Sequence, residues 1–273
     1  MRRDNHGRFR CRALVAVFAV VLSGCGTMAN GRGWGQDATL APGWARVGEA
    51  ALKAATAPET WVPAAGALAF QVGRADRHLE QWAVEKTPVF GSQQNADHMS
   101  DYLLEASGAI WVASGVATPS GNESGDWIMA KIKGFSVQTG AGILMRETVG
   151  FLKQNIGRTR PGGGGNDSFP SGHASGAAIF STLASRNIET LGWSQAATTA
   201  SQLGLGALTV ATAWARVEAN YHFPSDVLTS IAIGHYFGAF FTDAFLGIDN
   251  PRHAAVLLEP SREGVIALVR FDF

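Results

Sequence analysis

The sequence has little charge and lacks any extended run of basic residues. Only 16% of its 273 residues are charged, and 22 Lys and Arg balance 22 Asp and Glu to a formal net charge of zero. A nucleic-acid-binding protein carries a basic surface, so we expect no nucleic-acid partner. Intrinsic disorder is also excluded, because 46% of the residues are hydrophobic and 10% are aromatic. The length fits one large domain or two small ones.

Cysteine is almost absent from the chain. Cys11 and Cys25 are the two cysteines, and both lie close to the N-terminus. Residues 26–273 therefore have no thiol for a disulfide bond, and their stability must come from packing. No set of His, Cys and carboxylate residues has a convincing metal-ligand spacing. We therefore expect no metal and no other cofactor.

The N-terminus has the pattern of a secretory signal. Five arginines precede an apolar stretch, 13–22, of about ten residues, which is too short to span a membrane. The stretch ends in Leu22-Ser23-Gly24-Cys25, which resembles the bacterial lipobox, in which cleavage leaves an acylated cysteine as the first residue. An ordinary signal peptide with a chance cysteine is the alternative. We predict a lipoprotein signal peptide over 1–24 and a lipid-modified Cys25.

The segment after the signal predicts how the protein is attached and where. Residues 26–44 are rich in Gly and Ala without apolar periodicity, so we predict that 25–44 forms an acylated, flexible tether. Gly26, in place of Asp, resembles lipoproteins sorted to the outer membrane of Gram-negative bacteria. We therefore expect a protein of the cell envelope, lipid-anchored and facing the periplasm, in the outer membrane.

Most of the remaining chain is predicted to be helical. Amphipathic or Ala- and Gly-rich stretches are separated by short clusters of Gly, Pro, Asn and Ser. The expected helices cover 76–83, 97–116, 134–158, 174–188, 194–217 and 225–245. The last one contains Ser, Thr, His and Asp, so we expect it to pack in a globular bundle, with a polytopic membrane protein as the alternative. We predict an all-α, compact helical domain over 45–250 and a small C-terminal β-hairpin over 251–273.

The first of three polar clusters lies at the end of the helix 134–158. Lys153 and Arg160 are seven residues apart, which is two helical turns, so both cations project from one face. Pro161 then ends the helix. Alone, this pattern is typical of a solvated helix face.

The second cluster is Phe169-Pro170-Ser171-Gly172-His173, directly before an Ala- and Gly-rich helix. Ser171 and Gly172 at a helix start expose backbone N–H groups that can bind an oxyanion. His173 beside them can donate a proton to a leaving group. The alternative is an ordinary helix cap followed by a structural histidine.

The third cluster is the segment from Ala215 to Asp226. His222 and Asp226 are four residues apart at the opening of a helix, so the carboxylate can hold one imidazole nitrogen as N–H and leave the other free as a nucleophile. Arg216 adds a third cation near this pair. By itself this cluster is also a weak signal.

Together the clusters resemble the three-part signature of the type 2 phosphatidic acid phosphatase and vanadium haloperoxidase superfamily. That signature reads Lys-x6-Arg-Pro, Pro-Ser-Gly-His and Ser-Arg-x5-His-x3-Asp, and every internal spacing is present over residues 153–226. Ala215 stands where the family has Ser, for which we expect some tuning of activity. The loop 162–169 is short and contains four consecutive glycines, which predicts an open mouth to the site.

The resemblance implies the helical-bundle fold of that superfamily and a metal-independent phosphoryl transfer through a phosphohistidine. His222 is the expected nucleophile, Asp226 orients it, and His173 is the general acid and base. The expected phosphate-binding residues are Lys153, Arg160, Ser171, Gly172 and Arg216.

The predicted function is that of an acid-type phosphatase, a phosphoric ester hydrolase. Its substrates would be lipid phosphates such as phosphatidate or isoprenyl diphosphate, or small periplasmic phosphoesters, and its membrane contact the N-terminal lipid anchor. Vanadate, which mimics the phosphoryl transition state, is expected to bind as an inhibitor. The alternatives are a vanadium haloperoxidase, a phosphotransferase and a non-catalytic envelope lipoprotein, and the oligomeric state stays open.

Overall fold

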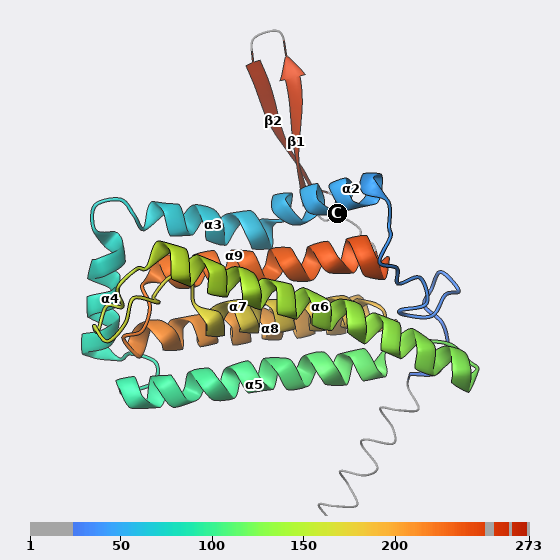
Figure 1. Cartoon of the computed structure of the whole chain (residues 1–273), viewed down its shortest axis with the longest axis horizontal. Helices are drawn as coiled ribbons and strands as arrows, with labels where there is room; N and C mark the ends of the chain where they lie inside the picture. The colour runs from blue at the N-terminus through green and yellow to red at the C-terminus, as the bar shows by residue number, and fades with distance from the viewer. Residues whose placement is uncertain (1–23, 249–253, 262–263, 272–273) are drawn as a thin grey trace, which may run out of the picture.

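The computed structural model describes residues 24–248, 254–261 and 264–271 (Figure 1). The predicted signal peptide therefore lies, apart from Gly24, outside the described residues. Within them the chain forms eight α-helices, which confirms the all-α class. These are α2 (Trp44–Thr56), α3 (Pro58–Ala69), α4 (Ala75–Lys86), α5 (Gln93–Ala117), α6 (Ser124–Ile156), α7 (Gly172–Glu189), α8 (Gln195–Glu218) and α9 (Pro224–Phe241).

Helix α7 is the centre of the bundle and packs against α5, α8 and α9. Its inward positions are mostly Ala, Ser and Gly, so neighbouring helices approach closely. At Gly234 of α9, an added Cβ would lie 2.4 Å from the carbonyl oxygen of Ser175 on α7, and only glycine allows this approach. The small residues of the helix predicted over 225–245 therefore serve helix packing, and a π-helical turn (Thr242–Leu246) follows α9. Among the described residues, no helix is long and apolar enough to cross a membrane.

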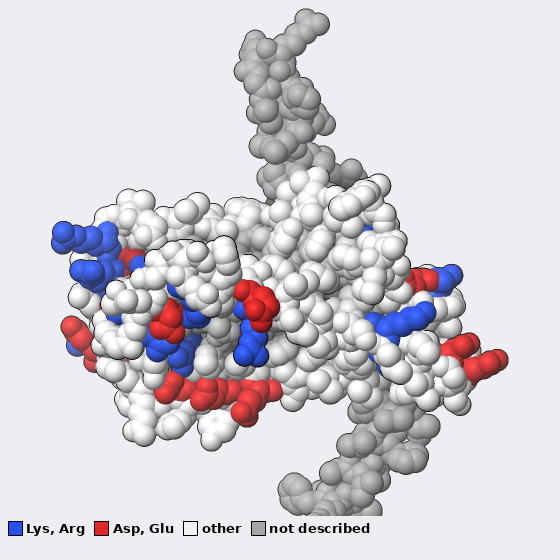
Figure 2. Space-filling view, in the orientation of Figure 1, with Lys and Arg blue, Asp and Glu red and all other residues white. Residues whose placement is uncertain are grey.

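The three polar clusters of the sequence meet at one end of the bundle. The C-terminal ends of α6 and α8 and the N-terminal ends of α7 and α9 lie there, beside α4 (Figure 1). Figure 2 shows acidic and basic side chains gathered together over this end of the molecule. The antiparallel course of consecutive helices thus converts motifs that are far apart in the sequence into one site.

The segment predicted as a flexible tether packs on the bundle instead. Trp34 is fully buried, and its ring meets Phe135 of α6 edge-on at 5.6 Å. Gly26 pairs with Gly121 in an isolated β-bridge. The prediction was wrong here because a single buried tryptophan, which removes a large apolar area from water, produces no hydrophobic periodicity. The side chain of Cys25 is exposed.

The C-terminal strands are β1 (Ala254–Ser261) and β2 (Gly264–Phe271). They pair antiparallel, with Ala254 opposite Phe271 and Ser261 opposite Gly264. Each strand thus pairs with the other along its whole length.

Candidate active site

Local structure at the helix ends sets the position of each predicted site residue. Helix α6 ends at Ile156 and is capped by Gly157, which has a left-handed φ of 59°, and Lys153 lies in its last turn. Arg216 lies in the last turn of α8. Ser171 caps α7, because its Oγ accepts a hydrogen bond from the N–H of Ala174 at 3.4 Å. Pro224 is the first residue of α9, where proline is favoured because its missing N–H has no partner to lose.

Three cations of the first and third motifs converge at this end. The guanidinium of Arg160 lies 4.8 Å from the ring centroid of Tyr221, and that of Arg216 lies 4.1 Å from the same ring. Tyr221 therefore holds the two arginines close together through cation–π contacts. Burial lowers the pKa of Lys153, which shares Asp167 as a partner with Arg160.

Each of these cations has a partly exposed carboxylate as its partner. Arg160 forms a bidentate pair with Asp167, in which Nε and Nη2 donate to the two carboxylate oxygens at 2.7 Å. The Nη1 of Arg216 donates to Asp97 at 2.6 Å. The side chains of Asp167 and Asp97 are 46% and 38% exposed. The three cations predicted to bind phosphate therefore lie at this end of the bundle, where they share two carboxylates, Asp167 and Asp97.

His222 lies close enough to these cations to feel their charge and is only 2% exposed. Its Nδ1 donates to the backbone carbonyl of Ser168, so Nδ1 carries the proton and the lone pair of the neutral ring lies on Nε2. Burial, followed by the positive charges of Arg216 and Lys153, lowers the pKa of His222 to about 3. The imidazole is thus neutral over the physiological range, as in-line attack on phosphorus requires.

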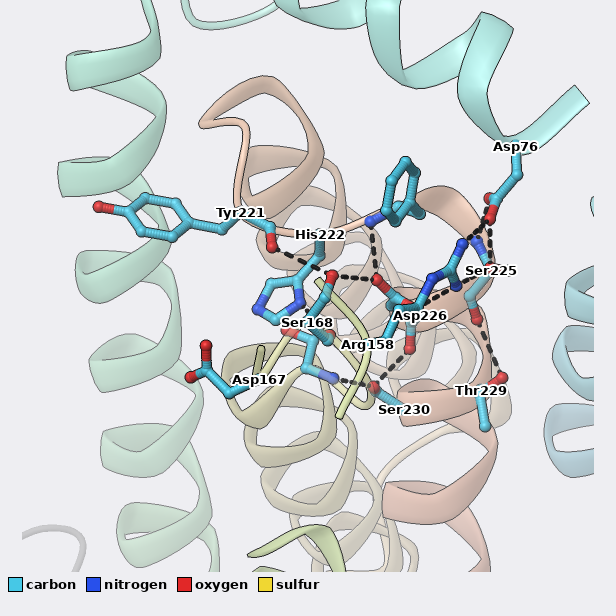
Figure 3. A network of polar contacts seen from close by, with 12 residues as sticks. Asp76, Arg158, Asp167, Ser168, Tyr221, His222, Ser225, Asp226, Thr229 and Ser230 are labelled. Atoms are coloured by element: carbon cyan, nitrogen blue, oxygen red, sulfur yellow. Dashed lines mark hydrogen bonds and ion pairs between the residues drawn. The ribbon is translucent and has the colours of Figure 1, made fainter. Parts of the chain in front are cut away.

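Asp226 was predicted to hold His222 directly, and the structure corrects this. The Oδ2 of Asp226 accepts from the hydroxyl of Ser168 at 2.6 Å and from the N–H of Phe223 at 2.9 Å (Figure 3). Asp226 therefore acts on His222 through Ser168, whose hydroxyl it binds and whose carbonyl holds the imidazole. Burial raises the pKa of Asp226, and the hydrogen bond from Ser168 opposes this shift.

A buried ion-pair network supports Asp226 from behind. Arg158 donates to Asp226 Oδ1 at 2.5 Å and to Asp76 Oδ2 at 2.7 Å. Asp76 also accepts from the backbone N–H of Ser225 at 2.8 Å. The network ties α4 to the first turn of α9. Sequence reasoning missed both supports, although Arg158 lies inside the first motif and Asp76 inside a predicted helix.

His173 is half-buried at the start of α7, and its side chain is 31% exposed. Its Nε2 lies 2.8 Å from Asp101 on α5. Burial and the charge of Arg216 lower the pKa of His173, and the contact with Asp101 opposes them. Asp101 was not predicted as a site residue. Its spacing of four residues from Asp97, within a predicted helix, was the signal that both carboxylates share a face.

Of the two residues predicted to offer backbone N–H groups, Ser171 and Gly172, only Gly172 remains a candidate to bind a substrate oxygen. The N–H of Ser171 donates to the hydroxyl of Ser230 at 2.7 Å, so it is not available to a substrate oxygen, and the prediction for this group was wrong. Gly172 is exposed as the first residue of α7, where helical N–H groups lack an intrahelical acceptor. Ala215, the departure from the family signature, is fully buried.

The arrangement combines groups that suit phosphoryl transfer. Three cations can neutralise the oxygens of a phosphoryl group, a neutral histidine can attack it, and a second histidine can exchange protons. In the described part of the chain, no group of three or more His, Cys, Asp or Glu side chains is placed to hold a metal ion.

Comparison with known proteins supports this interpretation. Residues 146–247 match the model of the PAP2 superfamily, and this span contains all three motifs. The match confirms the resemblance seen in the sequence and supports the predicted enzyme class, a phosphoric ester hydrolase. No curated protein sequence matches the chain.

One similar solved structure is a transmembrane PAP2-type phosphatidylglycerolphosphate phosphatase from Bacillus subtilis. The two chains share 20% identity with a TM-score of 0.51, over 71% of this chain and 95% of the other. At this identity the similarity establishes a common fold.

Proposed function

We propose that this protein is a metal-independent phosphatase of the lipid-phosphate type, acting through a phosphohistidine at His222. The observation that carries the proposal is the state of His222. It is neutral, its Nδ1 donates to the carbonyl of Ser168, and the nearby charges of Lys153, Arg160 and Arg216 act on it. A purely structural histidine has no need of three converging cations.

In the first half-reaction, the phosphoryl oxygens of the substrate bind to the three cations and displace the carboxylates of Asp167 and Asp97 from them. His222 Nε2 attacks phosphorus in line with the ester oxygen. The new N–P bond forms as the P–O bond to the leaving group breaks, and His173 donates its proton to the departing oxygen. The products of this step are the released alcohol and phosphorylated His222.

In the second half-reaction, neutral His173 takes a proton from water as that water attacks the phosphorus. The P–N bond breaks, its electron pair returns to Nε2 of His222, and inorganic phosphate leaves. Because the cations supply the charge neutralisation, no step needs a metal ion. Vanadate, whose trigonal form resembles the transferring phosphoryl group, should inhibit by binding the same cradle.

The proposed location is the cell envelope, with Cys25 as the lipid attachment site. Cys25 is exposed beside the strand-like contact of Gly26 with Gly121, at the end of the bundle where α6 begins. Lys153 lies near the other end of α6, about 45 Å away at 1.5 Å per helical residue. Because the segment after Cys25 is packed, the site reaches headgroups of the anchoring bilayer only if the bundle lies along the membrane.

The test is phosphate release by the protein in EDTA from a soluble aryl phosphate and from a short-chain phosphatidate. We expect release from at least one substrate, and its loss in His222→Ala. His78→Ala, at an exposed histidine of α4, is the matched control and should retain activity. The ratio of the two rates distinguishes a lipid from a soluble substrate. A strict requirement for divalent metal, or full activity of His222→Ala, would overturn the mechanism.

A further inference from the structure

Asp167 occupies the cations that the proposed mechanism assigns to the substrate. Both the Nε and the Nη2 of Arg160 donate to its carboxylate. Lys153 Nζ lies 3.9 Å from the carboxylate Oδ2 and also donates to the backbone carbonyl of the same residue. A guanidinium fork binds a phosphate and a carboxylate with the same bidentate geometry. While Asp167 is bound, this edge of Arg160 cannot bind a phosphate.

The loop that presents Asp167 is built to allow this contact. Gly163 and Gly164 have left-handed φ values of 74° and 83°, a conformation that is strained for other residues. At Gly165, an added Cβ would lie 2.8 Å from the Oδ1 of Asp167 and 3.8 Å from the Nε of Arg160. A side chain at 165 would therefore push Asp167 away from the arginine. The loop predicted to leave an open mouth thus places a carboxylate over it.

The carboxylate is also easily displaced. The side chain of Asp167 is 46% exposed, so it can turn into water without leaving a buried unpaired charge. In Figure 3 it points away from the buried network around Asp226. His222, by contrast, is almost completely covered. A phosphate that reaches Arg160 and Lys153 therefore has to compete with an easily released carboxylate.

We propose that Asp167 is an internal competitor of the substrate phosphate, which binds only by displacing this carboxylate from Arg160 and Lys153. The inference rests on the proposed function, because it assumes that these cations bind the phosphoryl group. Competition by Asp167 weakens the binding of every phosphate ligand, including the product phosphate. An opposite role, in which Asp167 positions Arg160 for the substrate, predicts that removal of the carboxylate weakens phosphate binding.

The test is the dissociation constant of inorganic phosphate and of vanadate, measured by titration calorimetry on the whole protein. Asp167→Asn should bind both anions about two- to fivefold more tightly than the parent, as expected for loss of one partly exposed charge-assisted pair. Gly165→Ala, which keeps the carboxylate but crowds it, should shift affinity in the same direction. Asp37→Asn, which removes an exposed partner of Arg32 elsewhere, is the control and should leave both constants unchanged.

The outcomes separate the two proposals. Tighter binding in both loop variants, with thermal midpoints near that of the parent, supports the competitor role. Equal or weaker binding in Asp167→Asn, with binding by the parent intact, overturns the competitor role and leaves the phosphatase proposal in place. If neither anion binds to the parent or to the variants, both proposals fail.

Discussion

Two sets of buried or half-buried cations in this bundle differ in the partners that they have. At the site end, Arg160 and Arg216 pair with Asp167 and Asp97, whose side chains are 46% and 38% exposed. Deeper in the bundle, Arg186 pairs with Asp243, and both side chains are at least nine-tenths buried. The first kind of partner can be exchanged for another anion at small cost, and the second cannot.

Lys131 is a second example of the fixed kind. Its Nζ donates to the carbonyl of Gly115 at 2.7 Å and to the carbonyl and hydroxyl of Thr118 at 2.6 Å. It also lies 5.1 Å from the ring of Trp34. Burial lowers the pKa of Lys131 to about 7. All three donors of the protonated amine are used, so this lysine ties α6 to the C-terminal end of α5 and has no donor left for a ligand.

The comparison shows that a buried cation alone does not identify an anion site. The exposure of its partner separates a binding group from a structural one. This follows from desolvation, since removal of one partner of a buried pair leaves a charge without water or counter-ion, whereas an exposed partner returns to water. The distinction makes opposite predictions for variants of the two sets.

The largest predicted difference is between Arg216→Gln and Arg186→Gln. Arg216→Gln should lower kcat/KM by about 10²–10³-fold, the usual effect of losing one oxyanion-stabilising group, with little change in stability. Arg186→Gln should destabilise the fold by about 1–3 kcal/mol, because Asp243 stays buried and keeps Lys53, 3.7 Å away, as a cationic partner. Denaturant titration and phosphatase kinetics of the folded fraction measure the two effects. The prediction would be contradicted if Arg216→Gln mainly lowered stability and Arg186→Gln mainly lowered activity.

A smaller effect is predicted for Ser168, the buried partner within the site. Ser168→Ala removes the hydroxyl that Asp226 binds and keeps the carbonyl that holds His222. We expect kcat to fall by about tenfold, in the range found for groups that orient an active residue, with KM nearly unchanged. If Asp226 acts through Ser168, Asp226→Asn should add little to this loss in the double variant. Fully additive losses would mean that Asp226 acts by another route.

The smallest predicted effects concern the dependence of kcat/KM on pH. His222 must be neutral, and its pKa is lowered to about 3, so kcat/KM should fall on acidification toward that value. His173 must be protonated to act as an acid, and its pKa is lowered from 6.5, so kcat/KM should fall again as pH rises through a value below 6.5. The result is a bell-shaped profile with an acidic optimum.

The Asp101 contact sharpens this prediction. Because Asp101 raises the pKa of His173 against the effects of burial and Arg216, Asp101→Asn should move the basic limb to lower pH. The acidic limb, set by His222, should stay in place. Comparison of the variant with the parent on one substrate removes the contribution of the substrate's own ionisation. A basic limb that does not move would show that His173 is not the group that titrates there.

The sequence predicted the parts of this site that depend on spacing along one chain segment. Lys153, Arg160, His173, Arg216 and His222 all lie at one end of the bundle, because helix ends carry the three motifs there. The contact between His222 and the Ser168 carbonyl was not predictable, since it depends on how the loop 162–169 folds back on α9. Asp167 was missed for the same reason.

The fold was likewise predictable where periodicity is strong. Helices α4–α9 correspond to the six expected helices, within a few residues at most ends. The segment 25–44 was misjudged because its packing depends on one side chain, Trp34, which meets Phe135 across about a hundred residues of sequence. The local sequence pattern does not indicate such a long-range contact.

The most direct measurement of the central claim is the capture of the covalent intermediate. The parent protein and the variants His222→Ala and His173→Asn would be mixed with an aryl phosphate, quenched in alkali and examined by peptide mass spectrometry. An aryl leaving group needs little protonation, so His173→Asn should accumulate the intermediate by losing the base of the second step. The account predicts one phosphoryl group on His222 and none in His222→Ala. A phosphoryl group on another residue, or turnover with no phosphorylated enzyme, would contradict it.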